Sequence, residues 1–224
     1  MSFLTGSTPA DVITFTSRSA WLAAVDQTTM QTADFEEFTE DVRFVPAPTG
    51  VGSVDAGPFS LAANKILGTS EILLPNRVDV APFRGSIDQT TNNAYVFVER
   101  DSNLEVTLTF DSPVFAFGAD FDRVNGAPGE RLDLVLTGAG SPILQAPDDD
   151  TFFGFVSDGG LVSQLVFQAR TANGTQSGTG FGLDNASVAF SASAVPEPSG
   201  LLLVAAAGFG FIIRHRVVKR SVQR

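Results

Sequence analysis

The chain has 224 residues, no cysteine, and 25 acidic against 14 basic residues, which gives a formal net charge of −11. This length suits one domain with a full hydrophobic core and leaves too little for two. The lack of cysteine excludes disulfides and thiol catalysis, and an acidic surface repels phosphate, so nucleic acid is not an expected partner.

The N-terminal residues 1–11 lack the basic and apolar segments of a secretory signal peptide. We interpret this segment as the remnant of a leader, or as a start assigned downstream of the natural one. A strand is predicted at residues 12–16, and Ser17 is placed to cap a helix that runs to Val25. Trp21 lies on the apolar face of this predicted helix and should be buried where the helix meets a sheet.

The remainder up to residue 190 has the patterning of β-strands. Apolar residues alternate with polar ones at 104–110 and again at 132–136, which predicts strands with one buried face. Residues 40–90 are richer in Pro and Gly and should supply long loops and edge strands. Five segments are more uniformly apolar and suit the inside of a sandwich: 95–98, 114–121, 152–156, 161–169 and 181–190.

Clusters of Gly, Pro, Asn and Asp separate these segments, and no long helical pattern lies between them. No segment repeats at a fixed period, which argues against a solenoid or a propeller. Twenty phenylalanines against one Trp and one Tyr indicate aromatic rings that fill a core. We therefore predict a mainly β fold, a jelly-roll-like antiparallel β-sandwich of two sheets over residues 12–190, with one short N-terminal helix.

Two short motifs of the interior resemble those of jelly-roll carbohydrate-binding modules. They are Asp-Phe-Glu at 34–36 and Gly-Leu-Asp-Asn at 182–185. In such modules, carboxylates of the first and last strands bind a structural calcium ion. The resemblance therefore implies calcium ligands at Asp34, Glu36, Asp184 and Asn185, which together offer three carboxylates and an amide.

These acidic residues also have a simpler interpretation, in which they cap turns, end strands or face solvent. Asp120 and Asp122 are two apart on one predicted strand and therefore share a face. Paired carboxylates can hydrolyse a glycoside, but the distance between two of them does not follow from sequence. A small glycosidase thus remains a third and weaker interpretation.

Catalysis by the usual triads has no support in the interior. The single histidine, His215, lies in the basic tail beyond the apolar run, and no cysteine is present. Ser-His-Asp and Cys-His arrangements are therefore excluded from the predicted sandwich. We expect a protein that is not an enzyme.

The most specific signal lies after the predicted sandwich. Residues 191–199 form a linker that carries the sequence Val-Pro-Glu-Pro, and residues 200–213 are an uncharged apolar run. Residues 214–224 form a basic tail, which the positive-inside rule places in the cytoplasm. The residues of the motif are Val195, Pro196, Glu197 and Pro198, and the basic anchors are Arg214, Arg216, Lys219 and Arg220.

This order of motif, apolar helix and basic end resembles the PEP-CTERM sorting signal of exported bacterial proteins. The resemblance implies recognition by an exosortase, a membrane enzyme that removes the tail, and transfer to a surface layer rich in exopolysaccharide. The apolar run has fourteen residues, fewer than the roughly 20 of an ordinary spanning helix. Snorkelling of Arg214 and Arg216 would lengthen the buried segment.

The sequence favours a non-enzymatic cell-surface or matrix protein that is sorted through this tail. Its precursor would be anchored in the inner membrane with the sandwich outside, and exosortase and extracellular polysaccharide would be its partners. The alternative is a carbohydrate-binding module stabilised by calcium. Trp21 and Tyr95 bear on that alternative, because a sugar site usually displays exposed aromatic rings.

Overall fold

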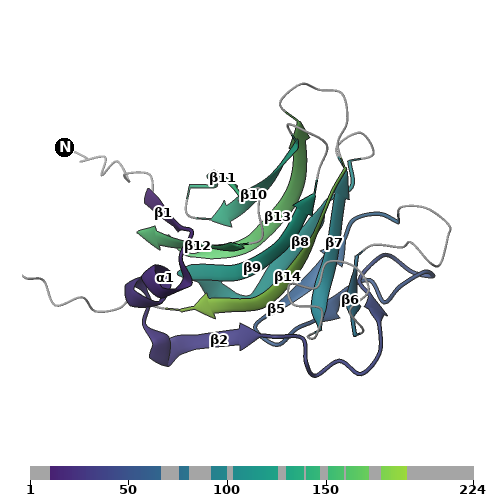
Figure 1. Ribbon diagram of the computed structural model, residues 1–224, viewed down its shortest axis with the longest axis horizontal. Helices are drawn as coiled ribbons and strands as arrows, with labels where there is room; N and C mark the ends of the chain where they lie inside the picture. The colour runs from purple at the N-terminus through teal and green to yellow at the C-terminus, as the bar shows by residue number, and fades with distance from the viewer. Residues whose placement is uncertain are drawn as a thin grey trace, which may run out of the picture. The chain divides into compact units, whose positions relative to one another are not determined.

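The computed structural model of the chain describes residues 11–66, 76–80, 92–99, 103–125, 130–138, 140–146, 151–158, 160–171 and 178–190. These residues form strands in two antiparallel sheets and one α-helix (Figure 1). The first elements are β1 (Asp11–Phe15), α1 (Arg18–Ala24), the 3-10 helix η1 (Gln27–Thr29), β2 (Met30–Ala33), β3 (Val42–Arg43), β4 (Val54–Asp55), β5 (Phe59–Ala63) and β6 (Arg77–Asp79). The others are β7 (Asn93–Glu99), β8 (Val106–Val114), β9 (Ala116–Asn125), β10 (Glu130–Gly138), β11 (Ile143–Gln145), β12 (Thr151–Asp158), β13 (Val162–Thr171) and β14 (Gly178–Ala189).

The larger sheet has eight strands in the order β1-β12-β9-β14-β7-β6-β3, with β2 paired to β14 beside this path. The smaller sheet has six strands in the order β11-β10-β13-β8-β5-β4. Both are built from antiparallel pairs, and many neighbours are distant in sequence, as in the pairs β1–β12 and β2–β14. The prediction of a mainly β, two-sheet antiparallel fold with a short helix is therefore confirmed.

Phenylalanine dominates the core between the two sheets, as the composition indicated. Phe121 of the larger sheet contacts Phe181 at 5.6 Å between ring centroids, and Phe167 of the smaller sheet meets Phe181 at 5.3 Å. All three rings are at most 1% exposed. Offset and edge-on contacts of this kind stabilise the pairing of sheets beyond simple burial.

Helix α1 covers part of the outer face of the larger sheet, away from the main core (Figure 1). The Ser17 side chain accepts a hydrogen bond from the Ala20 amide, so the predicted N-cap is confirmed. Trp21 is fully buried and donates from its indole nitrogen to the Phe155 carbonyl oxygen at 3.1 Å. The predicted contact between helix and sheet is thus present, with Trp21 at its centre.

The irregular region after β2 behaves only in part as predicted. Strands β3 and β4 do lie at the outer edges of the two sheets, whereas β5 and β6 each have a neighbour on both sides. The sandwich begins one residue earlier than expected, because Asp11 pairs with Asp158. No helix within the described residues is long and apolar enough to cross a membrane.

The predicted segments at both ends of the chain lie outside the described residues. They are residues 1–10, the linker 191–199, the apolar run 200–213 and the basic tail 214–224. The chain divides into two compact units, Met1–Ser193 and Ala194–Arg224. The boundary between the units falls just before the Val-Pro-Glu-Pro motif.

Candidate functional site

The outer face of the larger sheet is divided into an apolar part under α1 and a polar part beside it. Alternation along each strand determines which side chains lie on this face. Phe117, Ala119 and Phe121 point into the core, so Gly118 and Asp120 point outward. By the same reasoning the outward residues of the neighbouring strands are Asp184 on β14, Asn93 and Tyr95 on β7, and Arg77 and Asp79 on β6.

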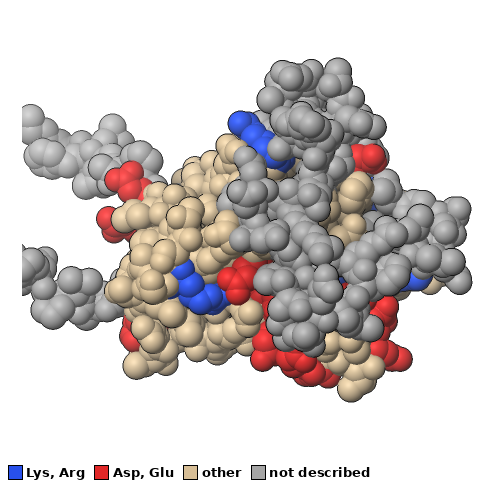
Figure 2. Space-filling model, in the orientation of Figure 1, with Lys and Arg blue, Asp and Glu red and all other residues tan. Residues whose placement is uncertain are grey.

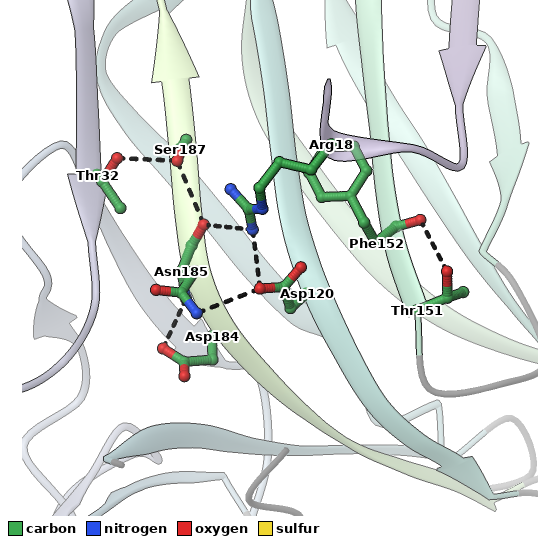
Figure 3. A network of polar contacts seen from close by, with 8 residues as sticks. All are labelled: Arg18, Thr32, Asp120, Thr151, Phe152, Asp184, Asn185 and Ser187. Atoms are coloured by element: carbon green, nitrogen blue, oxygen red, sulfur yellow. Dashed lines mark hydrogen bonds and ion pairs between the residues drawn. The ribbon is translucent and has the colours of Figure 1, made fainter. Parts of the chain in front are cut away.

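Arg18, the first residue of α1, forms the boundary between the two parts (Figure 3). Its Nη2 atom lies 2.9 Å from an Asp120 carboxylate oxygen and donates to the Asn185 carbonyl oxygen at 3.2 Å. The guanidinium carbon also lies 4.7 Å from the centre of the Phe152 ring. Arg18 therefore joins the helix to three different strands through one planar group, which the shape of guanidinium allows.

Asn185 lies at a bulge in β14 and holds this junction together. Its φ of 48° is in the left-handed region, which Asn tolerates better than most residues. The register between β14 and β9 shifts between Asp184 and Ser187, as expected where one strand carries extra residues. The Asn185 side-chain amide donates to Asp120 at 3.2 Å, and the Asn185 backbone amide donates to Asp184 at 2.6 Å.

A polar row crosses the sheet beyond this junction. In the strand register, Asp120 of β9 lies opposite Asp184 of β14, and Asp79 of β6 lies opposite Asn93 of β7. Leu183 is paired with Ala94; Asp184 follows Leu183 on β14 and Asn93 precedes Ala94 on the antiparallel β7, so Asp184 and Asn93 are neighbours across the two strands. The row Asp120, Asp184, Asn93, Asp79 therefore spans four adjacent strands.

Most of this row is withdrawn from solvent. Asp184 is 3% exposed, Asn93 is 1% and Asp79 is 2%, whereas the Asp120 side chain is 25% exposed. Arg77 forms ion pairs with Asp79 at 3.1 Å and with Asp41 at 3.7 Å. Buried carboxylates are costly unless they are paired or bind a cation, so such a row is a candidate site.

Two of the residues predicted as calcium ligands, Asp184 and Asn185, lie on β14, and the other two follow β2, the strand that pairs with β14. Strand β2 pairs with β14, Ala33 opposite Ala186, which brings the start of the 34–36 motif next to the 182–185 motif. Their side chains, however, make different contacts. Asp34 accepts from the Glu36 amide at 3.2 Å, and Glu36 accepts from the Asn92 amide at 2.8 Å.

Asp34 and Glu36 are exposed and belong to an acidic segment that follows β2. Figure 2 shows acidic side chains gathered at this lower edge of the molecule. Among the described residues, no three side chains of Asp, Glu, His or Cys form a group that could hold a metal ion. Calcium at Asp34, Glu36, Asp184 and Asn185 therefore stays a prediction.

Sequence reasoning missed Arg18, Asp79 and Asn93 as members of a site. Arg18 had a usable signal, since it follows the Ser17 cap and lies three residues before Trp21 on the same helix face. Asp79 and Asn93 had no such signal, because their pairing joins the irregular region to the strand that follows it, and no pattern in the sequence aligns the two. The sorting residues Val195–Pro198 and the basic residues of the tail lie outside the described part of the chain.

No family model, no curated protein and no solved structure matched the chain. The functional interpretation therefore depends on the residues and contacts of this chain.

Proposed function

We propose that the protein is a non-enzymatic surface protein of a bacterial cell, exported with its sandwich domain outside the inner membrane and sorted through its C-terminal segment. The observation that carries the proposal is the order of three features within about thirty residues of sequence. They are the motif Val195–Pro198, the apolar run 200–213 and the basic residues that follow it. The proposed partners are an exosortase-type enzyme, the inner membrane during transit, and extracellular polysaccharide.

The described domain is compatible with removal of the tail. Strand β14 lies inside the larger sheet, between β9 and β7, and ends at Ala189. The motif begins six residues later, at Val195. Cleavage at the motif would therefore remove no residue of any described strand, and the sandwich would keep all its pairings.

The finer fold assignment belongs to the same proposal. A jelly-roll-like arrangement is supported by the pairing of β2 with β14, which joins early and late strands of the chain. We assign the run 200–213 as a single membrane helix of the precursor. Arg214, Arg216, Lys219 and Arg220 would keep its far end in the cytoplasm.

Motif variants expressed in a bacterium that has an exosortase test this proposal. The chain, given a secretory leader, should be recovered from the surface fraction. Replacing Pro196 and Pro198 by Ala should leave the chain uncleaved in the inner membrane. The control is Glu40→Ala, a change at an exposed residue of the sandwich domain, and this variant should be sorted normally. Normal surface delivery of the double variant would reject the motif as a sorting signal.

A calcium-stabilised carbohydrate-binding module is the second candidate. The pairing of β2 with β14 favours it, because the first resembling motif follows β2 directly and so begins beside β14, which carries the second. It ranks second because Trp21 is fully buried and thus unavailable for stacking on a sugar. Binding of the domain to a glycan array, lost on addition of EDTA, would raise it above the first candidate.

A further inference from the structure

The polar row on the outer face of the larger sheet contains a buried acceptor that no described residue satisfies. Asn93 is 1% exposed, and among the described residues its Oδ1 atom has no hydrogen-bond partner. A buried acceptor without a partner costs free energy, and such an exception in a folded protein calls for a ligand or a strained role. This atom is therefore the observation from which the inference begins.

The surroundings of Asn93 are acidic on both sides. Asp79 lies directly opposite it on β6, and Asp184 lies beside it on β14. Side chains opposite each other in an antiparallel pair have Cβ atoms about 4.5–5.5 Å apart, so the Asp79 and Asp184 side chains lie on either side of the Asn93 side chain. The outward face of three adjacent strands thus presents three oxygen-bearing groups in a line.

We propose that Asp79, Asn93 and Asp184 bind a calcium ion on the outer face of the larger sheet. Calcium prefers carboxylate and amide oxygens at about 2.3–2.6 Å and completes its six to eight ligands with backbone carbonyls and water. The row offers two carboxylates and one amide, with neither His nor Cys among them, and this all-oxygen set disfavours zinc. The ion would use the Asn93 Oδ1 atom as a ligand.

This site differs from the set predicted from the sequence. It shares Asp184 but uses β6 and β7 in place of the acidic segment after β2, where Asp34 and Glu36 make other contacts. The two calcium sites can therefore be distinguished by variants. The proposal does not depend on sorting, because a chain that is never cleaved should bind the ion equally well.

Calcium titration of the full chain in detergent, after removal of metals with EDTA, tests the proposal. The wild type should bind one calcium ion per chain by titration calorimetry. Asn93→Leu should weaken binding by about tenfold or more, the loss typical when a group that supports a metal is removed. Asp34→Asn and Glu36→Gln are the matched controls and should bind calcium as the wild type does.

A gain-of-function variant excludes simple misfolding as the explanation. Asn93→Asp keeps the shape of the side chain and adds a third carboxylate, so it should bind calcium more tightly than the wild type. It should also lose stability without calcium and regain it when calcium is added. A merely unfolded variant cannot bind more tightly.

Three results would overturn the proposal. The first is a wild type that binds no calcium at millimolar concentration and carries none by elemental analysis. The second is an Asn93→Asp variant with no greater calcium affinity than the wild type. The third is loss of binding in Glu36→Gln with Asn93→Leu unaffected, which would place the ion at the set predicted from the sequence.

Discussion

Gly118 on β9 lies directly opposite Gly154 on β12, and the rings of Trp21 and Phe152 occupy the space that side chains at these two positions would fill. A Cβ atom on Gly118 would lie 2.6 Å from the Phe152 ring, and one on Gly154 would lie 2.9 Å from Trp21. The two glycines thus form a flat area of sheet on which α1 packs. Because Arg18 starts the same helix, this packing also places the Arg18 guanidinium beside Asp120.

The first prediction concerns Gly118. Gly118→Ala should lower the free energy of unfolding by about 1–3 kcal/mol, the usual cost of forcing an extra carbon into a packed contact. Urea denaturation followed by circular dichroism measures this loss. Since the nearest atom is the end of the Phe152 ring, the loss should shrink when the same change is made in a Phe152→Leu background.

Gly154→Ala provides the contrast. Its added Cβ would lie 2.9 Å from both the Phe152 and Trp21 rings and 3.0 Å from the Phe117 carbonyl oxygen, and a backbone atom cannot move aside as a ring can. The Phe152→Leu background should therefore rescue Gly154→Ala less than it rescues Gly118→Ala. Equal rescue of both variants would contradict the described packing of Trp21 and Phe152 against the two glycines.

The second prediction concerns the hydrogen bond of Trp21. Trp21→Phe keeps an aromatic ring but leaves the buried Phe155 carbonyl without its indole donor, and should cost about 1–3 kcal/mol of stability. Trp21→Leu, which also removes the ring, should cost more. Urea denaturation of the wild type and the two variants gives the order of their stabilities. A Trp21→Phe variant as stable as the wild type would show that this hydrogen bond contributes nothing to the free energy of unfolding.

The third prediction concerns the Arg18–Asp120 ion pair. Because the two side chains are 31% and 25% exposed, solvent screens the pair, and its coupling free energy should be about 0.2–1 kcal/mol. A double-mutant cycle with Arg18→Gln and Asp120→Asn measures this coupling, because each single change removes one of the two charges. The coupling should fall as salt is raised, and a coupling independent of salt would attribute the effect of Arg18 to its packing on Phe152 instead.

The local features of the fold were predictable from sequence because each depends on residues close together. The Ser17 cap, the helix around Trp21 and the alternating strand of Leu132, Leu134 and Leu136 all follow from spacing alone. The partners of these elements were not predictable. The pairing of Gly118 with Gly154 joins residues of different strands, and nothing in either local sequence specifies it.

The same limit explains the candidate site. Asp184 was selected from a local motif, but Asp79 and Asn93 become its neighbours only through the strand order β14-β7-β6. Among the described residues, Asn93 Oδ1 lacks a hydrogen-bond partner because of how the sheet packs, and the amino-acid composition does not predict this. The sequence thus shows which residue types the candidate site contains, and the strand order determines which of them are neighbours.

The intact mass of the chain recovered from the surface of its own host tests the central proposal most directly. Sorting through the motif predicts a single mature form that ends near Val195–Pro198 and lacks the apolar run and the basic tail. The described sandwich should remain complete in that form, because β14 ends at Ala189. Recovery of surface protein that still ends at Arg224 would contradict the proposal and would leave the motif as part of an ordinary membrane anchor.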